Sequence, residues 1–221
     1  MCNQFNHKLI TNPDGTQRYI TVEFSEEDFA WKRKMWENLE IDFKTVVKKP
    51  TDIIQSFSML DGQIIATEDA WGFKPSWSKR PIMNTQSEKL FDSTVWKHYI
   101  HNRILIPVKS FFEWQEQPNG KKHKYEITFK NTDSLFAGIW GVEDGKRWIT
   151  ILTQSANEKM KTIHNSGDNK HRQPVLMRNE FARSWIDPKI SNRKDVTDMI
   201  TQFMPDDTTE QDLDQEPTLF R

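Results

Sequence analysis

Short runs in which apolar and polar residues alternate dominate the chain, and clusters of turn residues separate these runs. Alternation with a period of two is the pattern of a half-buried strand. Two such runs within residues 53–71 flank Asp61-Gly62, a pair that favours a tight hairpin turn. Two apolar runs, at 135–140 and 148–153, flank Asp144-Gly145 and predict a second hairpin of buried strands. Further strands are predicted at 103–107, 111–116, 125–129 and 175–177.

Helix signals are fewer and lie irregularly between the strands. Ser25 and the acidic residues after it form an N-terminal cap before an apolar series from Phe29 to Leu39, which predicts a helix of about four turns. Shorter helices are predicted at 91–99, 157–163 and 181–185. Because strands outnumber helices, we expect an α+β single domain built on a curved, mainly antiparallel β-sheet, barrel-like, with peripheral helices.

Composition adds a core rich in aromatic rings and an uneven distribution of charge. At 221 residues the chain can bury a substantial core as one domain, and its nine Trp and fourteen Phe supply much of that core. The net charge is −1, but residues 205–221 carry six acids and one base, which leaves residues 1–204 with a net charge of +4. We expect a folded domain over 1–204 and an acidic, flexible tail over 205–221. The mildly basic domain permits a phosphate-binding face without requiring one.

Several classes of protein are disfavoured by what the sequence lacks. It has no long uninterrupted apolar run and no basic, apolar leader, so neither membrane insertion nor secretion is expected. Its single cysteine cannot form an internal disulfide, which fits a reducing cytoplasm. No Cys/His cluster has zinc spacing, and neither a Gly-rich phosphate loop nor a Gly-x-Ser-x-Gly elbow is present. We therefore expect a cytoplasmic protein without a metal or cofactor.

The one cysteine is Cys2, directly after the initiator Met1. Removal of Met1 would leave a single residue with a free α-amine and a thiol on adjacent carbons. An aldehyde condenses with such an amine to an imine, and the thiol closes the imine into a five-membered thiazolidine. With a pKa of about 7.7–8.0, an α-amine is partly neutral near pH 7, whereas a lysine amine is almost fully protonated. Position alone leaves two alternatives open, a nucleophile or a cysteine without a role.

Other positions carry side chains suited to proton transfer or anion binding. Glu113 lies among aromatic residues on a predicted strand, where burial raises a carboxyl pKa towards neutrality, although alternation also permits an exposed glutamate there. His164 follows a predicted helix and suits proton transfer at neutral pH, with His171 as its rival. Asn84 begins a polar stretch after a proline, where Asn also caps turns. The candidates for phosphate contacts, or equally for surface ion pairs, are Arg103 and Arg172.

Taken in order along the chain, these segments resemble the SRAP family, the SOS response-associated peptidase domain proteins. Cys2 occupies the position of the family's processed N-terminus, and residues 71–77 are similar to its Trp-Gly-x-x-Pro-x-Trp signature. Residues 84–88 are similar to its Asn-x-Arg-x-Glu segment. The series is completed by Arg103-Ile-Leu-Ile-Pro107, Phe112-Glu113-Trp114, Phe136-Ala-Gly-Ile-Trp140, residues 153–157, Ile163-His164 and Arg172-Gln-Pro-Val175. The resemblance spans residues 2 to about 185.

The resemblance implies a reaction with damaged DNA. In the SRAP family the N-terminal cysteine forms a thiazolidine crosslink with the open-chain aldehyde of an abasic site in single-stranded DNA, and the adduct shields the lesion. By position, Cys2 is then the nucleophile and Asn84 orients it by hydrogen bonding. Glu113 handles protons at the amine, and His164 transfers a proton at the sugar oxygen to aid ring opening. The residues implied to bind DNA are Gln4, Trp71, Trp77, Gln86, Arg103 and Arg172.

The same resemblance implies how the protein is processed and what it binds. The site that holds the cysteine is expected to remove Met1 by autoproteolysis. The implied partner is single-stranded DNA containing abasic sites, bound by a monomer that is associated with the nucleoid while on DNA. No membrane partner is implied.

The sequence departs from the family's pattern at three places. The family opens with Cys-Gly-Arg, whereas Gln4 stands at the arginine position here, and Gln86 replaces a second arginine. Both arginines would contact DNA phosphates, so we expect a weaker salt-dependent affinity, for which stacking of bases on the signature tryptophans could compensate. The family's histidine is followed closely by Arg-Met-Pro, but Arg172 lies about seven residues after His164. This spacing keeps His171 as an alternative, with His164 preferred because it directly follows the helix.

Two other functions remain compatible with the sequence. The first is an N-terminal-nucleophile peptidase or amidohydrolase that uses the Cys2 thiol with its own α-amine as base. The second is a non-covalent binder of single-stranded DNA, suggested by the aromatic loops and disfavoured by the charge balance. Dependence on an aldehyde and on Cys2 distinguishes the covalent reaction from both.

Overall fold

Five strands close into a barrel in the computed structural model, which describes residues 3–8, 45–130 and 134–215. The barrel strands are β3 (Ile53–Leu60), β4 (Gln63–Trp71), β6 (Arg103–Glu116), β8 (Leu135–Glu143) and β9 (Lys146–Ser155). Antiparallel pairing runs from β4 through β3, β6 and β8 to β9, and a parallel pairing of β4 with β9 closes the ring. The predicted curved, mainly antiparallel, barrel-like sheet is therefore confirmed.

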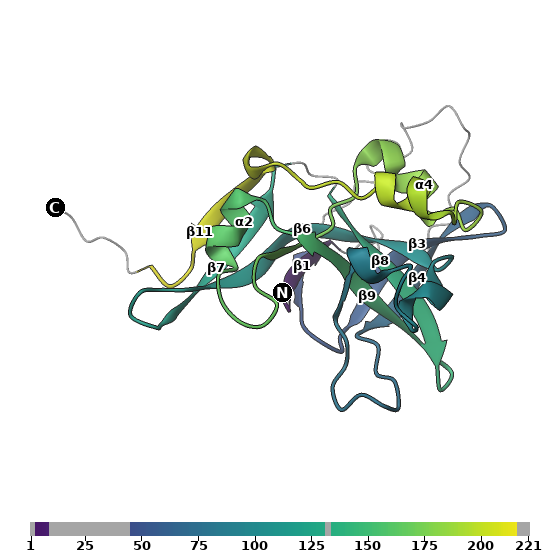
Figure 1. Cartoon of the computed structure of the whole chain (residues 1–221), viewed down its shortest axis with the longest axis horizontal. Helices are drawn as coiled ribbons and strands as arrows, with labels where there is room; N and C mark the ends of the chain where they lie inside the picture. The colour runs from purple at the N-terminus through teal and green to yellow at the C-terminus, as the bar shows by residue number, and fades with distance from the viewer. Residues whose placement is uncertain (1–2, 9–44, 131–133, 216–221) are drawn as a thin grey trace, which may run out of the picture.

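The remaining elements extend the sheet or cover it (Figure 1). Four strands continue it beyond the barrel, namely β1 (Phe5–Lys8), β2 (Thr45–Lys48), β7 (Lys122–Phe129) and β11 (Thr208–Asp212). Two short strands lie along β9, namely β5 (Asn84–Gln86) and β10 (Arg172–Pro174). The α-helices are α2 (Glu158–Ile163), α3 (Ala182–Ile186) and α4 (Arg193–Asp198). The 3-10 helices are η1 (Ser87–Lys89), η2 (Trp96–Tyr99), η3 (Asn179–Phe181) and η4 (Pro205–Asp207).

Strands β6 and β8 of the barrel are apolar on both faces because each face packs against a separate hydrophobic cluster. In β6, Ile104 and Ile106 belong to one cluster and Leu105 to the other. In β8, Phe136 belongs to the cluster of Ile104, and Ala137 belongs to the cluster of Leu105. Burial of both faces explains why β6 and β8 contain continuous apolar runs instead of alternating ones. The two hairpins predicted from their turn residues are confirmed, and Asp61 and Asp144 both have a positive φ.

Strand β6 is the element that joins the barrel to the rest of the sheet. Two separate strands, at 103–107 and 111–116, were expected, and this expectation is wrong because β6 is one strand of 14 residues. Its first half pairs with β8 as far as Pro107, and its second half pairs with β7 from Ser110 onward. The strand therefore changes partner at a proline, which cannot donate to a ladder but can remain extended. Figure 1 shows the barrel at one end of the molecule and β7, β11 and α2 at the other.

Other predicted elements need correction. The helix expected at 91–99 is reduced to η2, and the strand expected at 175–177 is wrong, because β10 ends at Pro174 and Leu176 forms only an isolated bridge with Phe136. Val175 and Met177 are buried, but their N–H groups bond to the carbonyls of two different strands, at Leu152 and Leu135. The helices expected at 157–163 and 181–185 are found as α2 and as η3 with α3. The helix expected from Ser25 to Leu39 lies outside the described residues.

The acidic C-terminal segment is part of the fold through β11. This strand pairs antiparallel with β7 along its whole length. Glu210 lies 3.1 Å from the ammonium of Lys159, and Asp212 lies 2.8 Å from Nδ1 of His123. The expectation of a flexible tail beginning at residue 205 is therefore corrected, because acids of β11 find basic partners on neighbouring elements.

The Trp71-Gly72 pair folds the chain back so that Met83 lies beside it. Trp71 is fully buried, its ring meets Phe5 edge-on at 5.0 Å, and its indole N–H donates to the carbonyl of Met83 at 3.0 Å. Gly72 has φ +116°, and a Cβ there would lie 1.9 Å from the Met83 Cε and 2.9 Å from the Pro81 Cβ. Only glycine fits this close approach, which holds the segment before Asn84 against the barrel.

We expect Gly72→Ala to lower the free energy of unfolding by at least about 2 kcal/mol, since it adds both backbone strain and a steric clash. Gly120→Ala is the matched control, because Gly120 has φ +77° with no atom within 4 Å of its added Cβ. That control should lose only the backbone contribution of about 1 kcal/mol. Urea unfolding measures both, and equal losses would contradict the packing role given to Gly72.

Candidate active site

Glu113 is a buried carboxyl group near the C-terminal end of β6. Its side chain is 2% exposed, so the alternative of an exposed strand-edge glutamate does not hold. It lies on the same face of β6 as Phe111, which is fully buried in the core. Burial raises the pKa of Glu113 to about 7. A carboxyl group with this pKa is populated in both protonation states near neutrality, as general acid–base chemistry requires.

His164 is a buried, neutral imidazole at the end of α2. Its Nδ1 lies 3.0 Å from the carbonyl oxygen of Arg172 and 3.3 Å from the backbone nitrogen of the same residue. Burial lowers the pKa of His164 to about 4, so the ring is neutral at physiological pH. The shorter contact favours the tautomer in which Nδ1–H donates to the carbonyl, and this tautomer leaves Nε2 as a proton acceptor. His171 is exposed, with φ 61°, and does not share this environment.

An ion pair between Arg172 and Glu88 braces the segment that holds His164. The two guanidinium nitrogens of Arg172 lie 2.8 and 2.7 Å from the two carboxylate oxygens of Glu88. Partial burial alone would raise the pKa of Glu88, but the hydrogen bonds and charge of Arg172 lower it below its usual value. Arg172 also donates to the carbonyl of Thr153 at 2.7 Å. Its backbone contacts His164, so the pair fixes the histidine relative to β9 and η1.

Sequence reasoning did not find the role of Glu88, although the residue lies within a recognised motif. The only signal available was its spacing four residues after Asn84, because its partner Arg172 is distant in the sequence. Gln173 also has a structural contact, because its side-chain oxygen accepts from the backbone N–H of Asn157, the N-cap residue of α2. The Arg172-Gln173 pair thus positions both ends of the short helix that precedes His164.

Asn84 is the first residue of β5 and is half-buried. It pairs in parallel register with Ile151 of β9. The carbonyl of the preceding Met83 accepts the indole N–H of Trp71, and Trp71 contacts Phe5 of β1. Trp71 therefore connects the first described strand with the segment that carries Asn84.

Backbone contacts converge on the end of β6 from two further elements. The N–H of Phe112 donates to the carbonyl of Gln4 at 3.0 Å, which brings the start of β1 alongside Glu113. The backbone of Glu116 exchanges two hydrogen bonds, of 2.8 and 2.9 Å, with the side chain of Asn165, the residue after His164. The structure thus ties the elements that carry Glu113 and His164 to each other and to the N-terminal strand. Cys2 lies outside the described residues.

Two residues expected to contact DNA have structural roles instead. Arg103 is 1% exposed, and its guanidinium donates to the carbonyls of Ile100, Trp185, Asp187 and Ile190. Burial lowers the pKa of Arg103 to about 10. Trp71 is 0% exposed. These expectations are corrected, because neither side chain has a surface that DNA could reach. Trp77 is 65% exposed and remains open to stacking, and Gln4 and Gln86 are both half-buried.

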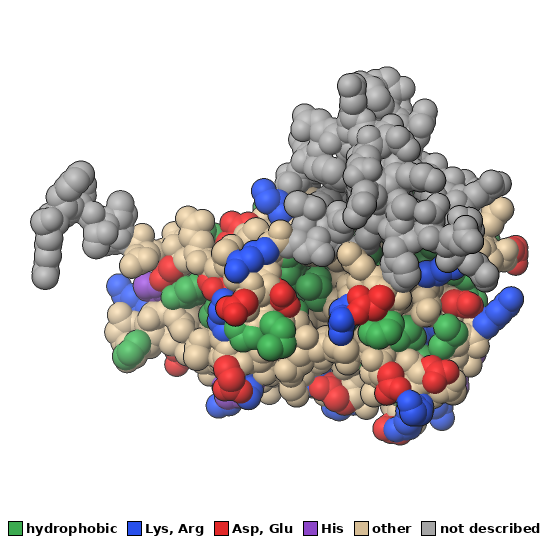
Figure 2. Space-filling view, turned by 90° about the horizontal axis from the view of Figure 1, so that it is seen from above, with side chains coloured by type: hydrophobic (Ala, Val, Ile, Leu, Met, Phe, Trp, Pro, Cys, Tyr) green, Lys and Arg blue, Asp and Glu red, His purple; other side chains and the backbone are tan. Residues whose placement is uncertain are grey.

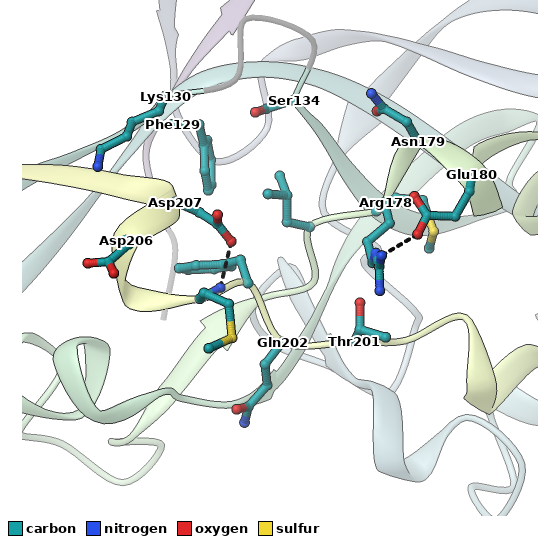
Figure 3. A pocket seen from close by; sticks show the side chains of 14 residues that line it. Phe129, Lys130, Ser134, Arg178, Asn179, Glu180, Thr201, Gln202, Asp206 and Asp207 are labelled. Carbon is teal, nitrogen blue, oxygen red and sulfur yellow. Dashed lines mark hydrogen bonds and ion pairs between the residues drawn. The ribbon is translucent and has the colours of Figure 1, made fainter. Parts of the chain in front are cut away.

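A pocket of about 720 Å³ lies away from these residues, between η4 and the segment that leads into η3 (Figure 3). Neither Asn84, Glu113 nor His164 lines it. Three of its charged groups are engaged with one another or with backbone: Arg178 pairs with Glu180, and Asp207 accepts from the N–H of Met204 at 2.6 Å. The pocket therefore contributes no chemistry to the site described above.

The surface of the described part of the chain carries both charges. Figure 2 shows acidic and basic side chains interspersed on the face seen from above. Among the described residues no group of three or more His, Cys, Asp or Glu is arranged to hold a metal ion. None of the helices described is long and apolar enough to cross a membrane.

Comparison with known proteins identifies relatives whose sequences are similar to this one. A family profile described as SOS response associated peptidase (SRAP) matches residues 1–215. The abasic site processing protein YoqW of Bacillus subtilis is 28% identical over 149 residues, covering 62% of this chain and 64% of the relative. The abasic site processing protein YedK of Escherichia coli is 26% identical over 131 residues, covering 56% of each. The match thus spans less than two thirds of these relatives' length.

Solved structures share the fold at lower identity. A phage-related protein from Bordetella bronchiseptica superposes with a TM-score of 0.69 at 21% identity, covering 97% of this chain and 95% of that one. A protein from Bacteroides thetaiotaomicron gives a TM-score of 0.63 at 18% identity, covering 74% and 75%. These structures support the fold alone. Since the family profile covers nearly the whole sequence, the chain belongs to the SOS response associated peptidase (SRAP) family.

Proposed function

We propose that this protein processes abasic sites in single-stranded DNA by covalent capture through Cys2. The observation that carries the proposal is the hydrogen bond between the Gln4 carbonyl and the Phe112 N–H, directly beside the buried Glu113. Two residues of chain span at most about 7 Å, so Cys2 cannot be far from Gln4 whatever its conformation. The relatives named as abasic site processing proteins support the same substrate.

The proposed reaction begins once hydrolysis has removed Met1. The free α-amine of Cys2 attacks the sugar aldehyde to give a carbinolamine, which loses water to form an imine. The thiol then adds across the carbon–nitrogen double bond, its sulfur to carbon and its proton to nitrogen, which gives the thiazolidine. One water is released, and no oxidant or reductant is needed. The adduct retains both the protein and the DNA strand.

Glu113 and His164 supply the proton transfers of this sequence. As a carboxylate, Glu113 accepts a proton from the α-ammonium, and in its protonated form it returns that proton to the departing hydroxyl of the carbinolamine. Its pKa of about 7 makes both forms available at neutral pH. The neutral His164 accepts the proton of the anomeric hydroxyl through Nε2 and returns it to the ring oxygen, which opens the sugar to its aldehyde. Asn84 orients the nucleophile by hydrogen bonding.

We expect the protein to form a heat-stable adduct with a single-stranded oligonucleotide that carries one abasic site. Denaturing gel electrophoresis measures the yield. Cys2→Ala should give none, because it removes the sulfur that closes the ring. An oligonucleotide with a tetrahydrofuran site is the matched negative control, since it lacks the aldehyde and should give no adduct. Equal yields from the wild type and Cys2→Ala, or from the two oligonucleotides, would contradict the covalent mechanism.

The pH dependence of crosslinking should contain a step near pH 7 that belongs to Glu113. Below this pKa the group is protonated and cannot accept a proton from the α-ammonium, so we expect the initial rate to fall as the pH decreases through it. Glu113→Gln should remove the step and slow the reaction by about 10²–10⁴-fold at neutral pH. Timed quenching of the crosslinking reaction over a pH series measures both effects.

Glu116→Gln provides the control on the same strand. Glu116 is exposed, and its contacts with Asn165 are made by its backbone. This variant should keep the wild-type rate and pH profile. If Glu113→Gln kept the step near pH 7 as well, proton transfer would have to be assigned to another group.

A further inference from the structure

Lys124 of β7 places an ammonium group beside the start of the chain. Its Nζ donates to the side-chain oxygen of Gln4 at 2.9 Å. The same Nζ lies 4.1 Å from the centroid of the Phe112 ring and 5.7 Å from that of Trp114. A ring face attracts an ammonium group, so the Gln4 amide and the two rings together hold the Lys124 side chain in place.

The charge on Lys124 is not neutralised by the acids around it. Asp214 lies near, but it accepts from the backbone N–H of Lys124 at 2.7 Å. Asp212 is paired with His123, and Glu126 accepts from Asn6 at 2.7 Å. Within the part of the chain that the structure describes, Lys124 forms no ion pair. Lysine has three N–H donors, and the contact with Gln4 uses one of them.

The cation lies beside the side chain of residue 4. Position 4 is Gln here, at the place where the resemblance of the first residues implies an arginine. The Gln4 side chain contacts the Lys124 ammonium, so the cation beside residue 4 comes from another strand. Lys124 is partly exposed and lies on the face of β6 and β7 that carries Phe112 and Trp114, which is opposite to the face of Glu113. It therefore flanks the start of the chain without lining the buried carboxyl group.

We propose that Lys124 contacts a backbone phosphate of the single strand next to the captured lesion, in place of the arginine absent from position 4. This inference rests on the proposed function and names a residue that determines affinity for the strand. A phosphate beside the start of the chain would meet an ammonium already ordered by Gln4 and Phe112, so little side-chain entropy is lost on binding. One phosphate neutralised on single-stranded DNA contributes about 0.7 to the slope of log affinity against log salt.

The test measures non-covalent binding of abasic single-stranded DNA in the Cys2→Ala background, by fluorescence anisotropy over a salt series. Lys124→Gln should weaken binding by about 3–10-fold at low salt and reduce the magnitude of the salt slope by about 0.7. Lys124→Arg should keep the affinity. Gln4→Arg combined with Lys124→Gln should restore it, because the charge returns to the same place from β1. Restoration by this double variant also shows that Lys124→Gln does not act by unfolding.

Lys194→Gln is the charge-matched control, since Lys194 lies on α4 at the other end of the molecule and is paired with Asp198 (Figure 1). It should leave affinity and slope unchanged. The inference would be overturned if Lys124→Gln and Lys194→Gln had the same affinity and salt slope, or if the double variant did not restore the affinity. If the wild type formed no adduct but Lys124→Gln reduced the salt slope as expected, only the covalent function would be contradicted. If the wild type formed the adduct but Lys124→Gln left the salt slope unchanged, only the phosphate contact would be contradicted.

Discussion

The burial of one carboxyl group, Glu113, is the constraint on which the rest of the site depends. It follows from the continuity of β6, which leaves the barrel at Pro107 and carries its second half between β1 and β7. Side-chain alternation then places Glu113 on the face that holds Phe111 in the core. A strand that ended at the barrel would leave this glutamate in water with an ordinary pKa. The proton chemistry that we propose for Glu113 near neutral pH is therefore a consequence of the topology.

The other functional residues are positioned by contacts that have no role in the chemistry. Arg172 and Glu88 form a bidentate pair that fixes the backbone around His164. Trp71 holds the segment before Asn84 against β1, and this packing requires glycine at the next position. Packing thus explains the Trp71-Gly72 pair of the signature. Arg172 is explained by its role in bracing His164. Residues that resemble DNA contacts in sequence can serve to position the candidate catalytic groups.

Elements specified by local sequence could be predicted, whereas those specified by a distant partner could not. The turns at Asp61-Gly62 and Asp144-Gly145 and the buried hairpins follow from local chemistry. The short strands β5, β10 and β11 have three to five residues each and are defined by their neighbours in the sheet. The burial of Arg103 in a group of carbonyls could not be read from a residue that is normally exposed. The candidate residues Glu113 and His164 were predicted, but their perturbed environments needed the tertiary structure.

The central claim is that the α-amine and thiol of one residue, Cys2, hold the DNA beside Glu113. Tandem mass spectrometry of the DNA-linked N-terminal peptide tests this claim most directly. The account predicts a peptide that begins at Cys2, lacks Met1, and carries the sugar on Cys2 with the loss of one water. A DNA-linked peptide that retains Met1, or that carries the sugar on a lysine such as Lys124, would contradict it.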